Sequence, residues 1–318
     1  MGEGSGIRLK ALISDRVDER LISRLRSELG VEVEYRPNIA RDELLKIIDG
    51  YDILVVRSRT RVDREVLDRA ARLRLIARAG VGLDNVDVEY ALRKNIAIVN
   101  APHAATESVA ELAIALMLMA ARNLHLYVAD VKSGKWSKGA YKGIELRGRT
   151  LGIVGFGRIG RRVGELGKAL GMRVVATDVI DISEHAKRLG VEVVSYGELL
   201  KVSDVVTFHV PLTKDTYHML NDDALRLVKD NAIIVNTSRG EVIDAEALLR
   251  HIDRLWGVGL DVLEHEPPST VHELELLKHP KVIAVPHIGA ETLEAQLKVA
   301  DEVFENIREA LMRVVNNG

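Results

Sequence analysis

Short apolar runs alternate with amphipathic stretches along the whole chain, and this alternation limits the possible folds more than any other feature. Twelve runs rich in Val, Ile and Leu, such as residues 150–155 (TLGIVG), are separated by segments such as residues 18–30 (DERLISRLRSELG). In the segments between the apolar runs, apolar side chains recur three and four residues apart, which is the period of an amphipathic helix. Strands that alternate with helices predict parallel sheets with helices on both faces.

The apolar runs form two groups, which indicates two domains. Five runs lie before residue 101 and seven lie after residue 149, more than one open twisted sheet usually holds. The helical pattern of residues 291–313 has no further strand to pair with, so we expect it to pack back on the first domain. We predict a discontinuous first domain, residues 1–98 with 289–318, and a second domain, residues 99–288. Both should be doubly wound α/β domains, flavodoxin-like and Rossmann-like respectively, with a ligand cleft between them.

Composition excludes several classes of function. The chain of 318 residues has a net charge of −2 and no cysteine. Without a basic excess we expect no nucleic-acid partner, and without cysteine there is no disulfide or zinc–thiolate site. The N-terminus lacks the apolar core of a signal peptide. The longest apolar run, residues 112–121, is shorter than the ~20 residues that cross a bilayer. We predict a cytoplasmic enzyme with no metal site and no membrane partner.

A G-x-G-x-x-G motif follows the apolar run at residues 150–155 and begins a helical pattern. Its first glycine permits a tight turn, its second lets a pyrophosphate approach the backbone, and its third lets the helix pack on the strand. Asp178 ends the next apolar run, where its carboxylate would bind the adenine ribose and repel a 2′-phosphate. The motif predicts NAD rather than NADP, and a tight turn without a cofactor is the alternative. Its residues are Gly155, Phe156, Gly157, Arg158, Ile159 and Gly160.

Three residues with catalytic chemistry follow apolar runs in the second half of the chain, namely Arg239, Glu266 and His287. In open parallel sheets, ligands bind outside the carboxyl ends of the strands. A histidine exchanges a proton near neutral pH, a carboxylate fixes its tautomer, and an arginine binds a carboxylate or polarises a carbonyl. Together with a nicotinamide, these residues would make a hydride-transfer site.

His209 is the rival candidate for the catalytic histidine, because it also ends an apolar run. The residues that follow it are more typical of a wall against an adenine ring, so we assign His209, Pro211 and Thr213 to the cofactor site. An ordinary loop position remains the alternative for His287.

Eight segments, in this order along the chain, resemble the D-2-hydroxyacid dehydrogenase family, and within it the short-form D-3-phosphoglycerate dehydrogenases. The resemblance covers nearly the whole chain from about residue 7. The segments are VVRSRT (55–60), RAGVGLDNVD (78–87), VNAPHAATESVAEL (99–112), LGIVGFGRIG (151–160), FHVPLT (208–213), VNTSRGEVID (235–244), GLDVLEHEPP (259–268) and VPHIGAET (285–292).

The resemblance implies roles for residues in most of these segments. It implies that the catalytic set is Arg239, Glu266 and His287, with the last two acting as a pair. It implies that backbone N–H groups around Val81 and Gly82 bind the substrate carboxylate, and that Asp261 lies near the nicotinamide. The expected substrate residues are Arg57, Ser58, Val81 and Gly82, and the NAD site is completed by Thr237, Asp261 and Gly289.

The choice of substrate rests on residues 55–60 and 99–112, which resemble phosphoglycerate dehydrogenases more than glyoxylate or hydroxypyruvate reductases. Arg57, Arg59 and Arg61 surround one strand end, where a phosphate would find a cationic cluster, although solvated charge is the alternative for at least one of them. We predict NAD-dependent oxidation of D-3-phosphoglycerate to 3-phosphohydroxypyruvate, the first step of serine biosynthesis. Glyoxylate or hydroxypyruvate reduction is the alternative among enzymes, and an NAD-sensing co-repressor is the alternative from another class.

Two expectations concern assembly and regulation. The first two-thirds of residues 104–136 is apolar around much of a helix circumference, which suits a helix buried in a large interface. We therefore predict a homodimer through residues 99–135, with a helix covered by its own chain as the alternative. Because the sequence ends at residue 318, we expect no C-terminal domain that responds to serine.

Overall fold

The computed structural model describes residues 8–316, which fold into two compact units. Unit 1 takes its described residues from Met1–Ala105 and Ala290–Gly318, and unit 2 is Thr106–Gly289. Each unit is built on one sheet, of five strands in unit 1 and seven in unit 2, and every strand pair is parallel. The two parallel-sheet α/β domains expected from the sequence are confirmed.

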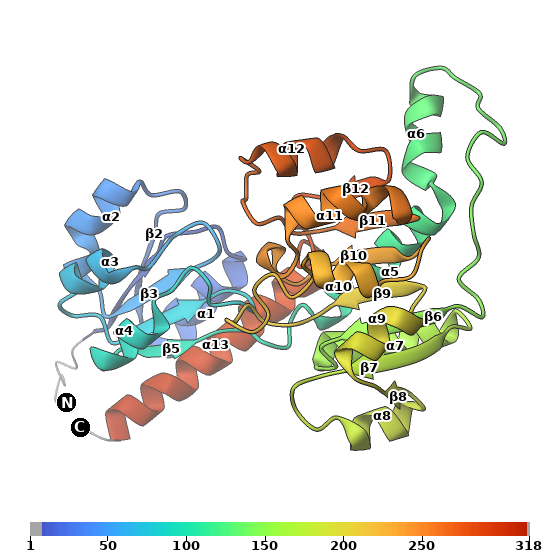
Figure 1. The fold of residues 1–318 in the computed structure, drawn as a ribbon. Coiled ribbons are helices and arrows are strands. Elements are labelled where there is room, and N and C mark those ends of the chain that lie inside the picture. The colour runs from blue at the N-terminus through green and yellow to red at the C-terminus, as the bar shows by residue number, and fades with distance from the viewer. Residues whose placement is uncertain (1–7, 317–318) are drawn as a thin grey trace, which may run out of the picture. The chain divides into compact units, whose positions relative to one another are not determined.

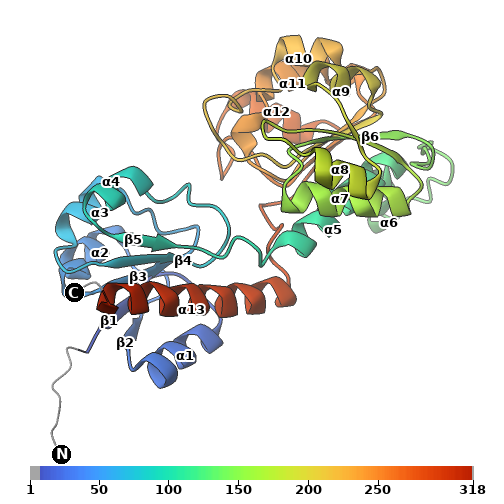
Figure 2. The ribbon, with the colours of Figure 1, turned by 90° about the horizontal axis from the view of Figure 1, so that it is seen from below.

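The sheet of unit 1 has helices on both faces. Its elements are β1 (Lys10–Ile13), α1 (Glu19–Leu29), β2 (Glu32–Tyr35), α2 (Arg41–Ile47), β3 (Ile53–Val56), α3 (Arg64–Arg69), β4 (Leu75–Arg78), α4 (Val88–Arg93), β5 (Ala97–Val99) and α13 (Leu293–Asn316). The strand order is β2-β1-β3-β4-β5, which is the flavodoxin-like order. α1 and α13 cover one face and α2, α3 and α4 cover the other (Figures 1 and 2). The order of the strands reverses between β1 and β3, where such sheets bind ligands.

α13 belongs to the core of unit 1 although it comes from the end of the chain. Its side chains Val303, Phe304 and Ile307 are fully buried and pack among side chains of β1, β3 and β4. The guanidinium of Arg24 on α1 lies 3.8 Å from the centre of the Phe304 ring, which adds a cation–π contact.

The chain passes from unit 1 to unit 2 later than the sequence indicates. We predicted the crossing after residue 98, whereas the two units divide between Ala105 and Thr106. The reason is that the segment after β5 still packs on the first sheet. The N–H of Ala101 donates to the carbonyl of Gly80 (2.8 Å), and Ala101 and Ala104 are buried in the core that contains α13.

Unit 2 is a seven-stranded doubly wound sheet. Its elements are α5 (Thr106–Arg122), α6 (Leu124–Lys132), β6 (Thr150–Val154), α7 (Arg158–Ala169), β7 (Arg173–Thr177), α8 (Ser183–Leu189), β8 (Glu192–Val193), α9 (Tyr196–Val202), β9 (Val205–Phe208), α10 (Asp222–Leu227), β10 (Ile233–Asn236), α11 (Ala245–His251), β11 (Gly257–Leu260), α12 (Val271–Lys278) and β12 (Val282–Ala284). The order β12-β11-β10-β9-β6-β7-β8 is that of a dinucleotide-binding sheet and reverses between β6 and β9.

α5 packs closely on the sheet of unit 2. A Cβ atom on Gly259 of β11 would lie 2.8 Å from the Cβ of Leu116, so the glycine lets the helix approach the strand. Leu116, Met117 and Ala120 of α5 are buried in this core. Among the described residues no single helix is long and apolar enough to span a membrane, although α5 and α6 together, bent by 73°, match those criteria.

The packing of α13 predicts that Phe304→Ala destabilises unit 1 by about 3–5 kcal/mol, because a large buried ring would leave a cavity. The measurement is the free energy of unfolding in urea, followed by circular dichroism. Met312→Ala on the same helix is the control, since Met312 is 55% exposed and its truncation should change stability by less than ~0.5 kcal/mol. Equal effects of the two substitutions would contradict the role given to Phe304.

Candidate active site

The glycine motif forms the turn between β6 and the first turn of α7. Gly155 has φ of +89°, a left-handed conformation that favours glycine. A Cβ atom on Gly160 would lie 2.1 Å from the carbonyl oxygen of Gly155, so only glycine lets α7 start this close to the strand. A Cβ atom on Gly157 would meet no protein atom within 4 Å. The backbone of Gly157 therefore faces open space at the N-terminus of a twelve-residue helix, where free N–H groups bind phosphates.

Asp178 follows β7 beside this turn. Its carboxylate accepts hydrogen bonds from the N–H groups of Phe156 (2.7 Å) and Val179 (2.7 Å). These bonds tie the end of β7 to the glycine motif and fix the carboxylate in place. A carboxylate has about four acceptor positions, so acceptors remain for the hydroxyl groups of a ribose.

The loop after β9 holds the residues assigned to the adenine wall. The hydroxyl of Thr216 donates to the carbonyl of Pro211 (2.6 Å) and accepts from the N–H of Thr213 (2.8 Å). His209 contacts Thr207 (3.0 Å) and Thr237 (3.5 Å) through its two ring nitrogens. Burial lowers the pKa of His209 to about 3, because desolvation disfavours the charged ring. His209 is therefore neutral at physiological pH, which favours His287 over it as the acid/base.

His287 and Glu266 form a close pair. Nδ1 of His287 lies 2.7 Å from Oε2 of Glu266. The hydrogen bond to Glu266 raises the pKa of His287, while burial opposes this shift and the negative charge of Glu266 adds to it. Burial acts to raise the pKa of Glu266, but the hydrogen bond and charge of His287 outweigh it, so this pKa is lowered. The pair therefore favours an imidazolium beside a carboxylate.

A buried carboxylate holds the segment that carries His287. Asp261, directly after β11, is 2% exposed and accepts from the N–H groups of Ile288 (2.6 Å) and Gly289 (3.0 Å). The N–H of His287 donates to the backbone carbonyl of Asp261 (2.8 Å). His287 itself has φ of +53°, a conformation that costs ~1 kcal/mol or more for a residue with a Cβ and persists only where its surroundings hold it. The three hydrogen bonds to Asp261 supply that restraint.

Arg239 comes just after β10 and lies in the same electrostatic environment. Its positive charge helps to lower the pKa values of both Glu266 and His287. A Cβ atom on the next residue, Gly240, would lie 1.9 Å from the backbone carbon of Leu263. This close backbone approach brings the loop of Arg239 against the loop of Glu266. The structure thus gathers Arg239, Glu266 and His287 in unit 2.

Glu273 supports the loop of Glu266 and is not among the residues predicted from the sequence. It is fully buried at the first turn of α12, and its carboxylate accepts from the N–H groups of His265 (2.8 Å), Ser269 (3.2 Å) and Thr270 (3.1 Å). Thr270 and Glu273 form a capping box. The spacing Thr-x-x-Glu before an apolar stretch was the signal available in the sequence.

The expected substrate residues lie in unit 1, in the segments after β3 and β4. The N–H of Arg57 donates to the buried carboxylate of Asp15 (2.6 Å), and Asn85 donates to the carbonyl of Arg57 (2.7 Å). Asn100 donates to the carbonyl of Val81 (2.6 Å), which positions the backbone of Val81 and Gly82. Ser58 lies between Arg57 and Arg59 in the same turn.

The three arginines predicted to form a cluster, Arg57, Arg59 and Arg61, have different surroundings in the structure. Arg59 pairs with Asp15 (3.2 Å) and donates to the carbonyls of Ser14 (3.0 Å) and Ile39 (3.2 Å), so its guanidinium stabilises unit 1 itself. Arg57 pairs with Glu291. Arg61 lies on an exposed position, beyond the turn.

Comparison with known proteins identifies the family. Residues 114–289 match the model described as D-isomer specific 2-hydroxyacid dehydrogenase, NAD binding domain. The chain belongs to this family. It is 43% identical to a hydroxypyruvate reductase of Thermotoga maritima, over 94% of this chain and 97% of that protein. It is 45% identical to a D-3-phosphoglycerate dehydrogenase of Methanocaldococcus jannaschii, over 95% of this chain but only 57% of that protein.

Solved structures of dehydrogenases have the same fold. A D-lactate dehydrogenase from Aquifex aeolicus complexed with NAD and lactic acid superposes with a TM-score of 0.85 at 29% identity and covers 96% of each chain. A glyoxylate reductase from Paecilomyes thermophila superposes with a TM-score of 0.87 at 30% identity, again with 96% of each chain covered. The protein is thus an NAD-dependent D-2-hydroxyacid dehydrogenase.

The geometry of unit 2 fits NAD. The turn at Gly155 and Gly157 leaves backbone open to a pyrophosphate at the N-terminus of α7. Asp178 would hold the adenine ribose, and the loop from His209 to Thr213 would line the adenine. Thr237 and Asp261 directly follow β10 and β11, and Gly289 lies in the segment after β12. The role of each of these residues remains a prediction.

The glycine geometry predicts different effects for two substitutions. Gly160→Ala should lower both the melting temperature and the affinity for NADH, because the new methyl group would clash with the Gly155 carbonyl. Gly157→Ala should leave the melting temperature unchanged, since the methyl group meets no protein atom, but weaken NADH binding about tenfold. Thermal unfolding and NADH fluorescence titration measure the two quantities. Wild-type NADH affinity in Gly157→Ala would show that this backbone does not approach the cofactor.

The His287–Glu266 pair predicts a pH dependence that NMR can follow. The ring resonances of His287 should titrate with a pKa above 6.5, because Glu266 favours the protonated ring. In Glu266→Gln the pKa should fall, since the hydrogen bond to a carboxylate and the negative charge of Glu266 no longer oppose burial. His209, with a pKa of about 3, should not titrate between about pH 5 and 9 and is the internal control. An unchanged pKa of His287 in Glu266→Gln would disprove the coupling.

Proposed function

We propose that this dehydrogenase oxidises D-3-phosphoglycerate to 3-phosphohydroxypyruvate, the first step of serine biosynthesis. The observation that carries the chemistry is the His287–Glu266 pair at 2.7 Å, within reach of the charge of Arg239. The observation that supports a phosphorylated substrate is Arg57, which follows β3 at the carboxyl edge of the sheet of unit 1, where a guanidinium can bind a phosphate through two hydrogen bonds.

The chemistry follows from the tautomer of His287. Because Nδ1 faces the carboxylate of Glu266, the neutral ring carries its proton there and leaves Nε2 as an acceptor. Nε2 then takes the proton of the C2 hydroxyl as the C2–H bond breaks and a carbonyl forms. The glycine turn at Gly155–Gly160 and Asp178 would hold NAD, which would supply the acceptor for the hydride from C2. Glu266 stabilises the imidazolium that results, and Arg239 holds the carboxylate and the oxygen that becomes the carbonyl.

Reduction of hydroxypyruvate or glyoxylate is the second candidate, and two observations favour it. Arg57 is already paired with the carboxylate of Glu291, so its charge is partly compensated. Among the relatives, the hydroxypyruvate reductase of Thermotoga maritima is matched over 97% of its length. The same His287, Glu266 and Arg239 would serve this reaction in the opposite direction, with His287 as the proton donor.

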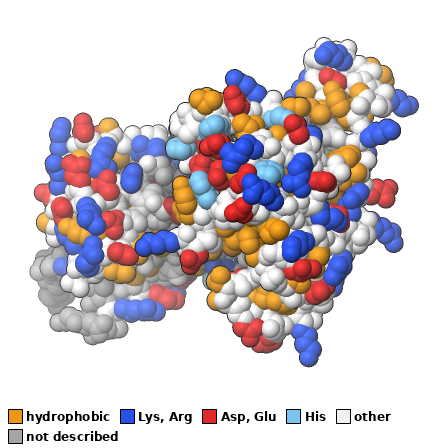
Figure 3. Space-filling model, in the orientation of Figure 1, with side chains coloured by type: hydrophobic (Ala, Val, Ile, Leu, Met, Phe, Trp, Pro, Cys, Tyr) orange, Lys and Arg blue, Asp and Glu red, His pale blue; other side chains and the backbone are white. Residues whose placement is uncertain are grey.

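We also propose that two copies of the chain associate through residues 99–135. Exposed apolar side chains on and beside α6 support this proposal, because soluble proteins rarely expose contiguous apolar patches. Figure 3 shows apolar side chains, in orange, in this part of unit 2. They are Leu124, Val128, Val131 and the adjoining Trp136, which is 83% exposed. A cytoplasmic location remains a prediction.

The proposed reaction predicts a substrate order. NADH oxidation should proceed with a kcat/KM for 3-phosphohydroxypyruvate well above those for hydroxypyruvate and glyoxylate. His287→Ala should reduce kcat by about 100- to 10,000-fold, the usual contribution of a general acid or base, with NADH affinity retained. If the unphosphorylated acids are the better substrates, the second candidate replaces the first. If no 2-keto acid is reduced, both are wrong.

A further inference from the structure

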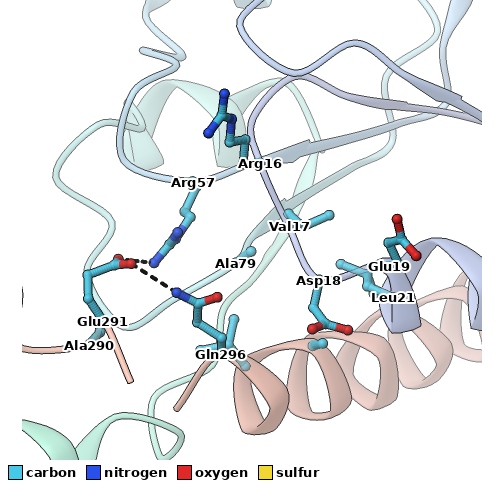
Figure 4. A pocket seen from close by; sticks show the side chains of 12 residues that line it. Arg16, Val17, Asp18, Glu19, Leu21, Arg57, Ala79, Ala290, Glu291 and Gln296 are labelled. Atoms are coloured by element: carbon cyan, nitrogen blue, oxygen red, sulfur yellow. Dashed lines mark hydrogen bonds and ion pairs between the residues drawn. The ribbon is translucent and has the colours of Figure 1, made fainter. Parts of the chain in front are cut away.

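A cavity in unit 1 lies at the point where the order of the strands reverses. It has a volume of about 470 Å³, which is in the range of small-ligand sites. Its walls come from the segments after β1, β3 and β4 and from the start of α13 (Figure 4). The carboxyl ends of β1 and β3 are where a sheet of this order binds ligands.

Two cations and three anions line this cavity. The cations are Arg16 and Arg57, and the anions are Asp18, Glu19 and Glu291. The carboxylate of Asp18 caps α1 by accepting from the N–H of Arg20 (2.9 Å). Glu19 lies in the first turn of α1, where a negative charge stabilises the helix dipole. Asp18 and Glu19 therefore stabilise the start of α1. Glu291 has no such role in that helix.

Glu291 is held on Arg57 from two sides. One oxygen of its carboxylate pairs with the guanidinium of Arg57. The other accepts from Nε2 of Gln296, on the first turns of α13, at 2.9 Å. Figure 4 shows both interactions as dashed lines, with the Arg57 side chain extended toward Glu291. The two side chains are 28% and 43% exposed, so water and ligands can reach the pair.

We propose that Glu291 is a specificity-determining residue, because its carboxylate occupies the guanidinium that a phosphate on the substrate would use. This inference rests on the proposed function and names the part of the substrate that the cavity recognises. A phosphate must displace the Glu291 carboxylate from Arg57. The phosphate then lies near another negative charge, and both effects lower its affinity for the site. An acid without a distal charge leaves the Arg57–Glu291 pair intact. Glu291 therefore sets how strongly the enzyme distinguishes phosphorylated from unphosphorylated 2-hydroxy acids.

Kinetics with two substrates test this role. The measured quantity is the ratio of kcat/KM for 3-phosphohydroxypyruvate to kcat/KM for hydroxypyruvate. In Glu291→Gln this ratio should rise about three- to tenfold, from the energy of a partly exposed ion pair, and the change should appear in KM rather than kcat. Glu294→Gln is the matched control, because it removes the same charge from the first turn of α13 outside the cavity lining, and its ratio should equal that of the wild type.

The same Glu291→Gln substitution in an Arg57→Met variant tests whether phosphate and the Glu291 carboxylate compete for Arg57, or whether only the loss of a negative charge matters. In Arg57→Met, the substitution Glu291→Gln should change the ratio much less than in the wild type, because the guanidinium for which phosphate and carboxylate compete is absent. An equal rise in both backgrounds would overturn competition at Arg57. An unchanged ratio in Glu291→Gln would overturn the role of Glu291 altogether.

Binding measurements without catalysis test the role of Glu291 independently of the proposed reaction. Isothermal titration of the wild type and of Glu291→Gln with D-3-phosphoglycerate and with D-glycerate requires no reaction. Tighter binding of only the phosphorylated acid to Glu291→Gln supports the inference even if no 2-keto acid is reduced. No gain in affinity, with melting temperatures alike, overturns it even if the enzyme is active.

Discussion

Parallel pairing is the constraint on which the rest of the structure depends. Because every strand pair in both sheets is parallel, the segments that leave the strands gather at one edge of each sheet. In unit 2 this edge receives the glycine motif after β6, Arg239 after β10 and His287 after β12. In unit 1 the same rule collects the segments after β1, β3 and β4 around one cavity.

Buried carboxylates then hold these segments in a defined geometry. Asp15 holds Arg57, Asp261 holds the segment from His287 to Gly289, and Glu273 holds the loop of Glu266. Each accepts backbone N–H groups, and hydrogen bonds to a charged group contribute about 1.5–3 kcal/mol. The residues that make these anchors do no chemistry themselves. They fix the positions of the residues that do, which is what a proton transfer over hydrogen-bond distance requires.

The charges in the two units have different uses. In unit 2 the hydrogen bond to Glu266, with its negative charge, raises the pKa of His287, so the pair can hold a proton taken from a substrate. In unit 1 the negative charge of Glu291 compensates Arg57, so the pair can tune which anion is bound. A glutamate beside His287 therefore serves catalysis, and a glutamate beside Arg57 serves substrate selectivity.

The sequence by itself determined the strands, the helices, the cofactor motif and the catalytic candidates, because these depend on local periodicity and on residue types that follow an apolar run. Gly155, Asp178 and His287 could be placed at strand ends in this way. The tertiary structure decided which partners meet. No local sequence pattern indicates that Arg59 pairs with Asp15 or that Arg57 pairs with Glu291. Each pair joins segments that are far apart in the chain. The packing of Ala101 and Ala104 also moved the crossing between units past residue 98. Such outcomes depend on long-range packing, which local patterns do not encode.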